Sequence, residues 1–151
     1  MEFEDATGDD LPFLLEMAAM FNHGPEALSV KDWKVSGDVG IIGLADDDRR
    51  RLGAAWYRLH RLHGAPPGVF PPRPIVREVF IGVVPDEQGH GRGTALLAEL
   101  IRRAFADRTV SILVAAINPT VKASVELFRR RGFTKGNDDR WTLSLQRRPS
   151  R

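Results

Sequence analysis

The spacing of apolar residues predicts a strand and then a helix at the start of the chain. Residues 3–6 predict a short strand. From Leu11 onward the apolar side chains recur at helical spacing, and they predict a helix that ends near residues 22–24. Thr7 and Asp10 have the spacing of a capping box just before this helix. Its apolar face is expected to hold Leu11, Leu14, Leu15, Ala18 and Phe21.

A short helical segment and a hairpin are predicted next. Residues 26–35 predict the helical segment, and residues 37–44 and 49–61 predict the two strands of the hairpin. The acidic residues 46–48 and the basic residues 49–51 face each other across the hairpin end, as in a solvated charged turn. The second strand has two distinct faces, with Ala55, Tyr57 and Leu59 on one and Trp56, Arg58 and His60 on the other.

A proline-rich loop and two buried strands follow. Residues 63–74 contain five prolines and two glycines among twelve residues, a composition that excludes a helix or a central strand. We expect a surface loop there that forms one wall of a cleft or the contact of a homodimer. Residues 75–84 predict the central strand, which contains one carboxylate, Glu78. Residues 110–117 predict another strand, buried on both faces.

Two helices and a last strand complete the pattern. Residues 91–106 predict a helix whose buried stripe holds Leu96, Leu97, Leu100, Ile101, Ala104 and Phe105. The next helix starts at residues 118–120 and ends at Gly132, and its stripe holds Val121, Val125 and Phe128. Residues 140–146 predict the last strand, and the basic residues 147–151 predict a disordered tail.

Composition narrows the class of protein. A chain of 151 residues buries about 70% of its unfolded surface, which is enough for one core. The 22 basic and 20 acidic residues are too balanced to indicate a nucleic-acid partner. The absence of cysteine excludes disulfides and a thiolate nucleophile, and His60 and His63 lack the spacing of metal ligands. Without a signal-peptide pattern or an apolar run of ~20 residues, we expect a soluble cytoplasmic protein that spans no membrane.

The central strand leads into a glycine-rich turn. Pro85 stops the strand, and Gly89, Gly91 and Gly93 precede the apolar stripe of the following helix. The amides of a first helical turn lack partners and lie at the positive end of the helix dipole, so this turn predicts an anion site. The alternative is a tight turn that binds nothing. Three glycines in five residues weaken a helix, which favours a requirement other than folding.

Two well-known phosphate loops do not fit this turn. A nucleotide-hydrolysing P-loop needs a lysine after its glycines, and none follows here. The dinucleotide fingerprint needs a third glycine where Thr94 stands.

The turn instead resembles the acetyl-CoA signature of the GNAT N-acetyltransferase superfamily, Val-x-Pro followed by [Gln/Arg]-x-x-Gly-x-[Gly/Ala]. The matching residues are Val83, Pro85, Gln88, Gly91 and Gly93. The resemblance implies that acetyl-CoA is the cofactor, that the loop amides hold its pyrophosphate, and that the preceding strand pairs with its pantetheine arm. It implies cofactor-binding roles for Val83, Val84, Gln88, Gly89, His90, Gly91, Arg92, Gly93, Thr94, Asn118 and Ser124.

The C-terminal half of the chain resembles a second GNAT segment, which is written Ile-x-Pro-x-Asn-x-Ala-Ser and ends in Gly-Phe. The chain matches it at Ile117, Pro119, Ala123, Ser124, Gly132 and Phe133. Val121 stands at the asparagine position, and Phe128 stands where many GNAT enzymes carry a tyrosine general acid. The single tyrosine, Tyr57, lies on another predicted strand.

Glu78 is the candidate general base. GNAT enzymes often carry a glutamate on this strand that deprotonates the amine, directly or through water. A carboxylate in a buried strand is costly unless it is functional or paired, and a salt bridge to Arg58 or to the neighbours of Arg77 is the structural alternative. Many relatives place the glutamate in phase with the positions of Ile81 and Val83. Glu78 is out of phase with them, so a bulge would be needed to re-aim it.

The resemblance implies one α/β domain over residues 1–146, with a mixed, mostly antiparallel sheet flanked by helices. Its implied function is transfer of an acetyl group from acetyl-CoA to a primary amine of a small molecule or peptide. The alternative is an acyl-CoA-binding regulatory or structural module of the same fold that has lost the chemistry. The acceptor amine cannot be read from the residues.

Overall fold

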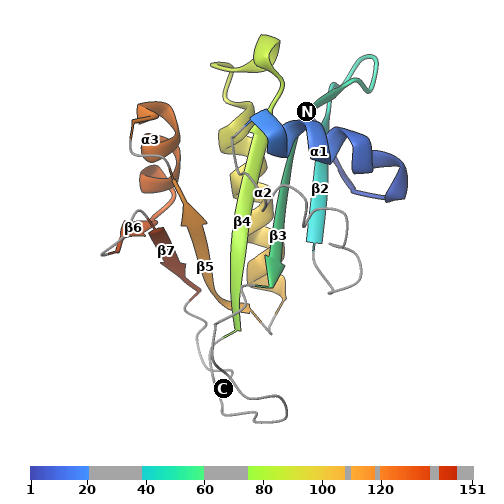
Figure 1. The fold of residues 1–151 in the computed structure, drawn as a ribbon. Helices are drawn as coiled ribbons and strands as arrows, with labels where there is room; N and C mark the ends of the chain where they lie inside the picture. Colours follow the sequence, from blue (N-terminus) through green and yellow to red (C-terminus); the bar gives the residue numbers. More distant parts are fainter. Residues whose placement is uncertain (21–38, 60–74, 108–109, 118–119, 137–139, 146–151) are drawn as a thin grey trace.

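The computed structural model describes residues 1–20, 39–59, 75–107, 110–117, 120–136 and 140–145 (Figure 1). The predictions for residues 22–24, 26–35, 63–74 and 147–151 lie outside these described residues. The helices of the described part are η1 (Gly8–Asp10), α1 (Leu11–Met20), η3 (Pro85–Glu87), α2 (Arg92–Ala106) and α3 (Lys122–Arg130). None of them is long and apolar enough to cross a membrane.

The described strands form one sheet in the order β1-β2-β3-β4-β5-β7-β6. Only β4 and β5 run parallel, and every other neighbouring pair is antiparallel. This arrangement confirms the mixed, mostly antiparallel sheet. The strands are β1 (Glu2–Asp5), β2 (Val39–Leu44), β3 (Arg51–Leu59), β4 (Ile75–Val83), β5 (Val110–Ala116), β6 (Thr134–Lys135) and β7 (Arg140–Ser144).

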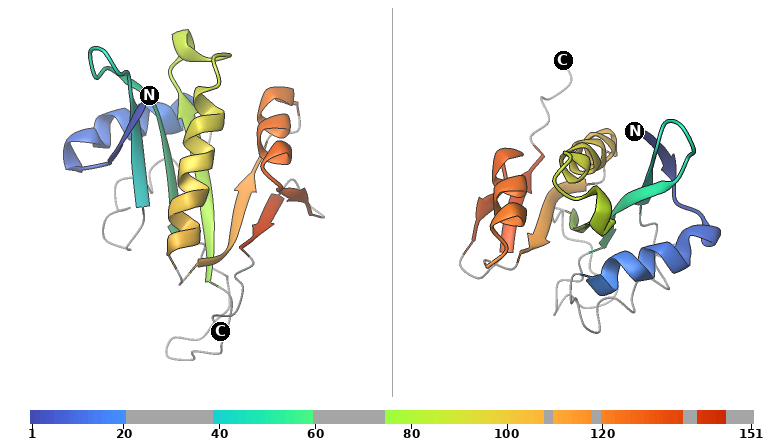
Figure 2. Two further views of the ribbon diagram at one scale, coloured as in Figure 1. Left: turned by 180° about the vertical axis from the view of Figure 1, so that it is seen from behind. Right: turned by 90° about the horizontal axis from the view of Figure 1, so that it is seen from above.

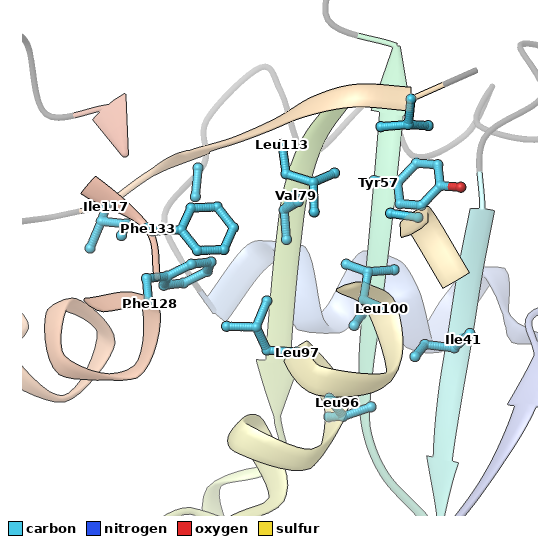
Figure 3. Packing of buried hydrophobic residues seen from close by; sticks show 14 of the residues in the cluster. Ile41, Tyr57, Val79, Leu96, Leu97, Leu100, Leu113, Ile117, Phe128 and Phe133 are labelled. Carbon is cyan, nitrogen blue, oxygen red and sulfur yellow. The ribbon is translucent and has the colours of Figure 1, made fainter. Parts of the chain in front are cut away.

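Helices cover both faces of the sheet (Figure 2). On one face, α1 packs on the central strands, and this core includes Leu14, Met17, Trp56 and Phe80. On the other face, α2 and α3 cover a larger core around Leu100, and Figure 3 shows this core. The alternation predicted for β3 is confirmed, because Tyr57 belongs to the second core and Trp56 to the first.

The start of α1 follows the predicted capping box. The backbone N–H of Thr7 donates to the Asp10 carboxylate at 2.8 Å, and the backbone N–H of Asp10 donates to the Thr7 carbonyl at 3.0 Å. These bonds close the short η1 turn, which then continues into α1.

Several sequence predictions were wrong in detail. Phe105 at the end of α2 is 50% exposed, and Val121 at the start of α3 is 44% exposed, so neither belongs to a buried stripe. Met17 is fully buried although the stripe left it out, and the short strand β6 was not predicted.

The charged hairpin end is exposed, as predicted, and its arginines also reach other elements. Arg49 bonds to Glu2 and Glu4 of β1. Arg51 donates to Asp10 Oδ1 through Nε at 3.0 Å and Nη2 at 2.9 Å. These ion pairs tie the β2–β3 turn to the N-terminal elements.

Candidate active site

The sheet opens between its two parallel strands. The register of β4 and β5 includes Ile75 with Val110 and ends with Glu78 opposite Val114. Beyond this pair β4 continues to Val83 with partners on β3, while β5 continues with partners on β7. Figure 1 shows β5 turning away from β4 toward α3. The upper half of β4 therefore has one backbone edge that no described strand pairs.

The register with β3 shows which backbone groups face this opening. The N–H of Val84 donates to the Leu52 carbonyl at 2.9 Å, so Val84 directs its backbone groups toward β3. Because the direction alternates along a strand, Ile81 and Val83 direct theirs toward the opening. The Val83 carbonyl accepts a hydrogen bond from Gln88 Nε2 at 3.2 Å. Gln88 therefore ties the following loop to the edge of the opening.

The loop at the end of β4 needs glycine for its backbone conformation. Gly89 has a φ of 83° and Gly91 a φ of 78°, both in the left-handed region that other residues rarely adopt. A methyl group at either position would meet no atom within 4 Å, so the requirement is conformational and not steric. Gly91 is also the N-cap residue of α2.

Gly93 is a different case, because it lies in the first turn of α2 at an ordinary φ. A methyl group there would lie 3.5 Å from Leu127 Cδ2 and 3.7 Å from Val83 Cγ2, which are ordinary contact distances. The site thus tolerates the Gly or Ala that the signature allows.

Six consecutive backbone N–H groups, from Gly89 to Thr94, donate to no acceptor in the described part of the chain. The first helical bond at this end runs from the Ala95 N–H to the Gly91 carbonyl at 3.1 Å. The loop is largely exposed, so these donors are available to an anion at the positive end of the α2 dipole. His90 is exposed beside them, and the Arg92 side chain bends back toward Glu87 Oε2 at 3.5 Å.

Glu78 is the one buried charged residue among the described positions, at 8% exposure. The pairing of β4 with β3 has no register shift from Arg77 to Val83, so no bulge changes the direction of the Glu78 side chain. Glu78 therefore shares a face with Phe80, on the side of the sheet that α1 covers. The register places it opposite Arg58 on β3 and Val114 on β5, where the opening begins.

Phe128 lies on the other side of the sheet (Figure 3). Its side chain is 7% exposed and meets Phe133 edge-to-face, with 5.1 Å between the ring centroids. Ser124 is half-buried one turn earlier on α3, and Asn118 lies outside the described residues. The Tyr57 hydroxyl donates to Asp107 Oδ2 at 3.3 Å beyond the C-terminal end of α2. Tyr57 is thus far along α2 from the glycine loop.

Sequence reasoning missed an ion-pair network next to the loop. Glu87 of η3 accepts a hydrogen bond from Arg50 Nη2 at 3.0 Å, and Arg92 approaches its second oxygen. The hydrogen bond from Arg50 is the main cause that lowers the pKa of Glu87. Arg50 and Glu87 are 37 residues apart, so no local spacing could reveal this contact.

Comparisons with known proteins agree on one family. The family model described as "Acetyltransferase (GNAT) family" matches residues 9–133. A mycothiol acetyltransferase of Arthrobacter sp. is 30% identical over 142 residues, which cover 87% of this chain and 41% of that protein. The mycothiol acetyltransferase of Cellulomonas flavigena is 38% identical over 97 residues, 61% of this chain and 26% of that protein. The chain thus spans about two fifths or less of these relatives.

Solved structures share the fold. The putative acetyltransferase yncA from Salmonella typhimurium, solved with its cofactor acetyl-CoA, has a TM-score of 0.72 and 19% identity, covering 100% of this chain and 97% of that chain. A ribosomal-protein-alanine N-acetyltransferase from Brucella melitensis has a TM-score of 0.71 and 23% identity, covering 96% of this chain and 100% of that chain.

Proposed function

Because this chain belongs to the acetyltransferase (GNAT) family, we propose that it transfers an acetyl group from acetyl-CoA to a primary amine. The observation that carries the proposal is the position of two features on one strand. The sheet opens at Glu78, and the loop with unpaired amides begins just beyond Val83 at the other end of the same strand segment. A carboxylate and an anion site are thereby held at the two ends of one opening.

The described residues fit acetyl-CoA. The amides of residues 89–94 would hold the pyrophosphate, since they have no acceptor in the described part of the chain and no side chain at Gly89 or Gly91 blocks them. The backbone groups of Ile81 and Val83 would pair with the amides of the pantetheine arm. We place Gln88, His90, Thr94 and the backbone N–H of Arg92 around the phosphates, and Val84, Asn118 and Ser124 along the arm.

Acetyl-CoA, when bound, supplies a thioester whose carbonyl carbon is open to attack by a neutral amine. An alkylamine with a pKa of about 10.4 is neutral in only about one molecule in 2,500 at pH 7, a deficit of about 4.6 kcal/mol. We assign Glu78 the removal of this proton, directly or through one water, because it is the buried carboxylate at the point of β4 where the opening begins. The amine nitrogen then bonds to the carbonyl carbon as the carbon–sulfur bond breaks.

Phe128 provides no proton for the departing sulfur. A thiol with a pKa of about 8.5 leaves tolerably as the thiolate, so a general acid is not required. We infer that Phe128 and Phe133 instead exclude water from this side of the opening, since the two rings are packed edge-to-face in the core. The thiolate takes its proton from solvent.

The acceptor is a small-molecule or peptide amine. The curated relatives are named for mycothiol, but the chain spans 41% of the first of them, so their substrate belongs in a test panel and is not assigned. The cytoplasmic location and the homodimer stay predictions.

Turnover with a panel of amines tests the proposal. Purified protein is mixed with acetyl-CoA and with alkylamines, amino acids, peptides, aminoglycosides and the substrate of the mycothiol acetyltransferases. We expect at least one class of amine to be acetylated. Mass spectrometry detects the acetylated product, and the amount of thiol released should equal it. Tight CoA binding without acetylation of any class would favour the acyl-CoA-binding module.

A further inference from the structure

Two carboxylates lie shortly before the unpaired amides, separated from them by Gln88, where negative charge opposes the binding of an anion. Asp86 and Glu87 are neighbours in η3, and they differ in their partners. Asp86 is exposed and has no ion-pair partner in the described part of the chain. The Glu87 side chain is 17% exposed and lies between two arginines. The η3 turn therefore carries two negative charges, and of the two only the Glu87 carboxylate forms ion pairs in the described part of the chain.

The arginines that Glu87 holds come from different elements. Arg50 follows the β2–β3 turn and donates to Glu87 Oε1 at 3.0 Å and to Asp48 Oδ2 at 2.9 Å. Arg92 is the first residue of α2, and its Nε lies 3.5 Å from Glu87 Oε2. The two arginines and two carboxylates of this Glu87 network sum to zero net charge.

The network also sets where the Arg92 guanidinium lies. Arg50 and Arg92 line one hollow together with Ala45, Asp46 and Asp47 of the β2–β3 turn. Arg92 is thus held on the side of that turn, although its backbone N–H is one of the unpaired amides of the loop. Arg50 lowers the pKa of Glu87, so the Glu87 carboxylate stays charged at neutral pH.

We propose that Glu87 is a positioning residue that holds Arg50 and Arg92 away from the loop amides and thereby limits the affinity for CoA phosphates. This inference rests on the proposed function. A free guanidinium beside a phosphate would add charge-assisted hydrogen bonds that the amides alone do not supply. Holding both guanidinium groups on a carboxylate leaves phosphate binding to the amides, so the product CoA dissociates more readily.

The test compares Glu87→Gln with Asp86→Asn, because both variants remove one negative charge from η3 and only the first removes the carboxylate that Arg50 and Arg92 share. Calorimetry measures the Kd of each for CoA and for inorganic pyrophosphate, at low and high salt. We expect Glu87→Gln to bind both ligands about tenfold more tightly, and Asp86→Asn less than about threefold. The gain in Glu87→Gln should shrink at high salt. Adding Arg92→Gln to Glu87→Gln should remove most of it.

The binding results distinguish a failure of the role proposed for Glu87 from a failure of the proposed function. Weaker binding by Glu87→Gln would overturn the proposal, since Glu87 would then support the loop, and so would equal gains in the two variants. Wild-type protein that binds pyrophosphate but not CoA would overturn the proposed function, and the role of Glu87 would be judged on pyrophosphate alone. Wild-type protein that binds neither would overturn both. Thermal unfolding without ligand checks that the variants are folded.

Discussion

Glu78 of β4 lies opposite Val114 of β5 in the last register pair that joins the two parallel strands. From Glu78 to Val83 the strand spans about 17 Å at 3.3 Å per residue, and the glycine loop begins just beyond it. The candidate base and the phosphate loop thus occupy opposite ends of the unpaired edge of β4. Substitutions at the two ends should therefore separate catalysis from cofactor binding.

At the loop end, Gly91→Glu should abolish CoA binding. The variant places a negative side chain among amides that are expected to hold phosphates, and it strains a residue with a φ of 78°. Gly91→Ala is the matched control, because it carries the same backbone strain of about 1–2 kcal/mol without charge or bulk. Calorimetry should show weaker but measurable binding in Gly91→Ala. Unchanged CoA affinity in Gly91→Glu would place the phosphates elsewhere.

Phe128→Tyr should change kcat by less than about tenfold, because the thiolate leaves without a proton and general acids typically contribute ~10²–10⁴. The new hydroxyl enters a side chain that is only 7% exposed, so we expect the free energy of unfolding to fall by about 1–3 kcal/mol unless the hydroxyl finds a partner. Steady-state kinetics and urea unfolding measure the two effects. A hundredfold rise in kcat would show that protonation of sulfur limits the reaction.

Stability should fall in acid partly through Asp10. Burial raises the pKa of Asp10, but the Thr7 N–H and the Arg51 guanidinium lower it more, so it lies below its ordinary value of 3.8. A carboxyl group with a lowered folded-state pKa stabilises the fold above its unfolded pKa, and this contribution is lost as the pH falls through the folded pKa. Asp10→Asn should cost roughly 1 kcal/mol at pH 7 and less below pH ~4. Equal losses at pH 7 and pH 3 in urea unfolding would contradict this role.

The spacing of apolar residues correctly predicted those buried positions that depend only on neighbouring turns of a helix. The stripe of α2 was right at Leu96, Leu97 and Leu100, because Leu100 lies one turn after the other two on the face that packs on the sheet. It was wrong at Phe105, since the last turn of the helix carries this side chain out to solvent, and the spacing of apolar residues cannot show this. The strand β6 is two residues long, which is too short for an alternation to appear.

In the candidate site too, the sequence indicated local backbone features but not contacts between distant elements. The glycine requirement at Gly89 and Gly91 is a property of the local backbone, so the run of closely spaced glycines in the sequence could indicate it. The face on which Glu78 lies depends on its register with β3, and only the assembled sheet shows that no bulge re-aims it. The partners of Glu87 depend on the packing of the β2–β3 turn against η3, for which the sequence carries no periodic signal.

Glu78→Gln tests acetyl transfer most directly, because it replaces the carboxylate with an amide of the same shape. With an amine that the wild-type protein acetylates, we measure kcat by thiol release and the Kd for CoA by calorimetry on the same preparation. We expect kcat to fall at least ~100-fold while the Kd stays within about twofold, since the variant loses the base and keeps the phosphate loop. A wild-type kcat in Glu78→Gln would contradict the assignment of Glu78 as the base.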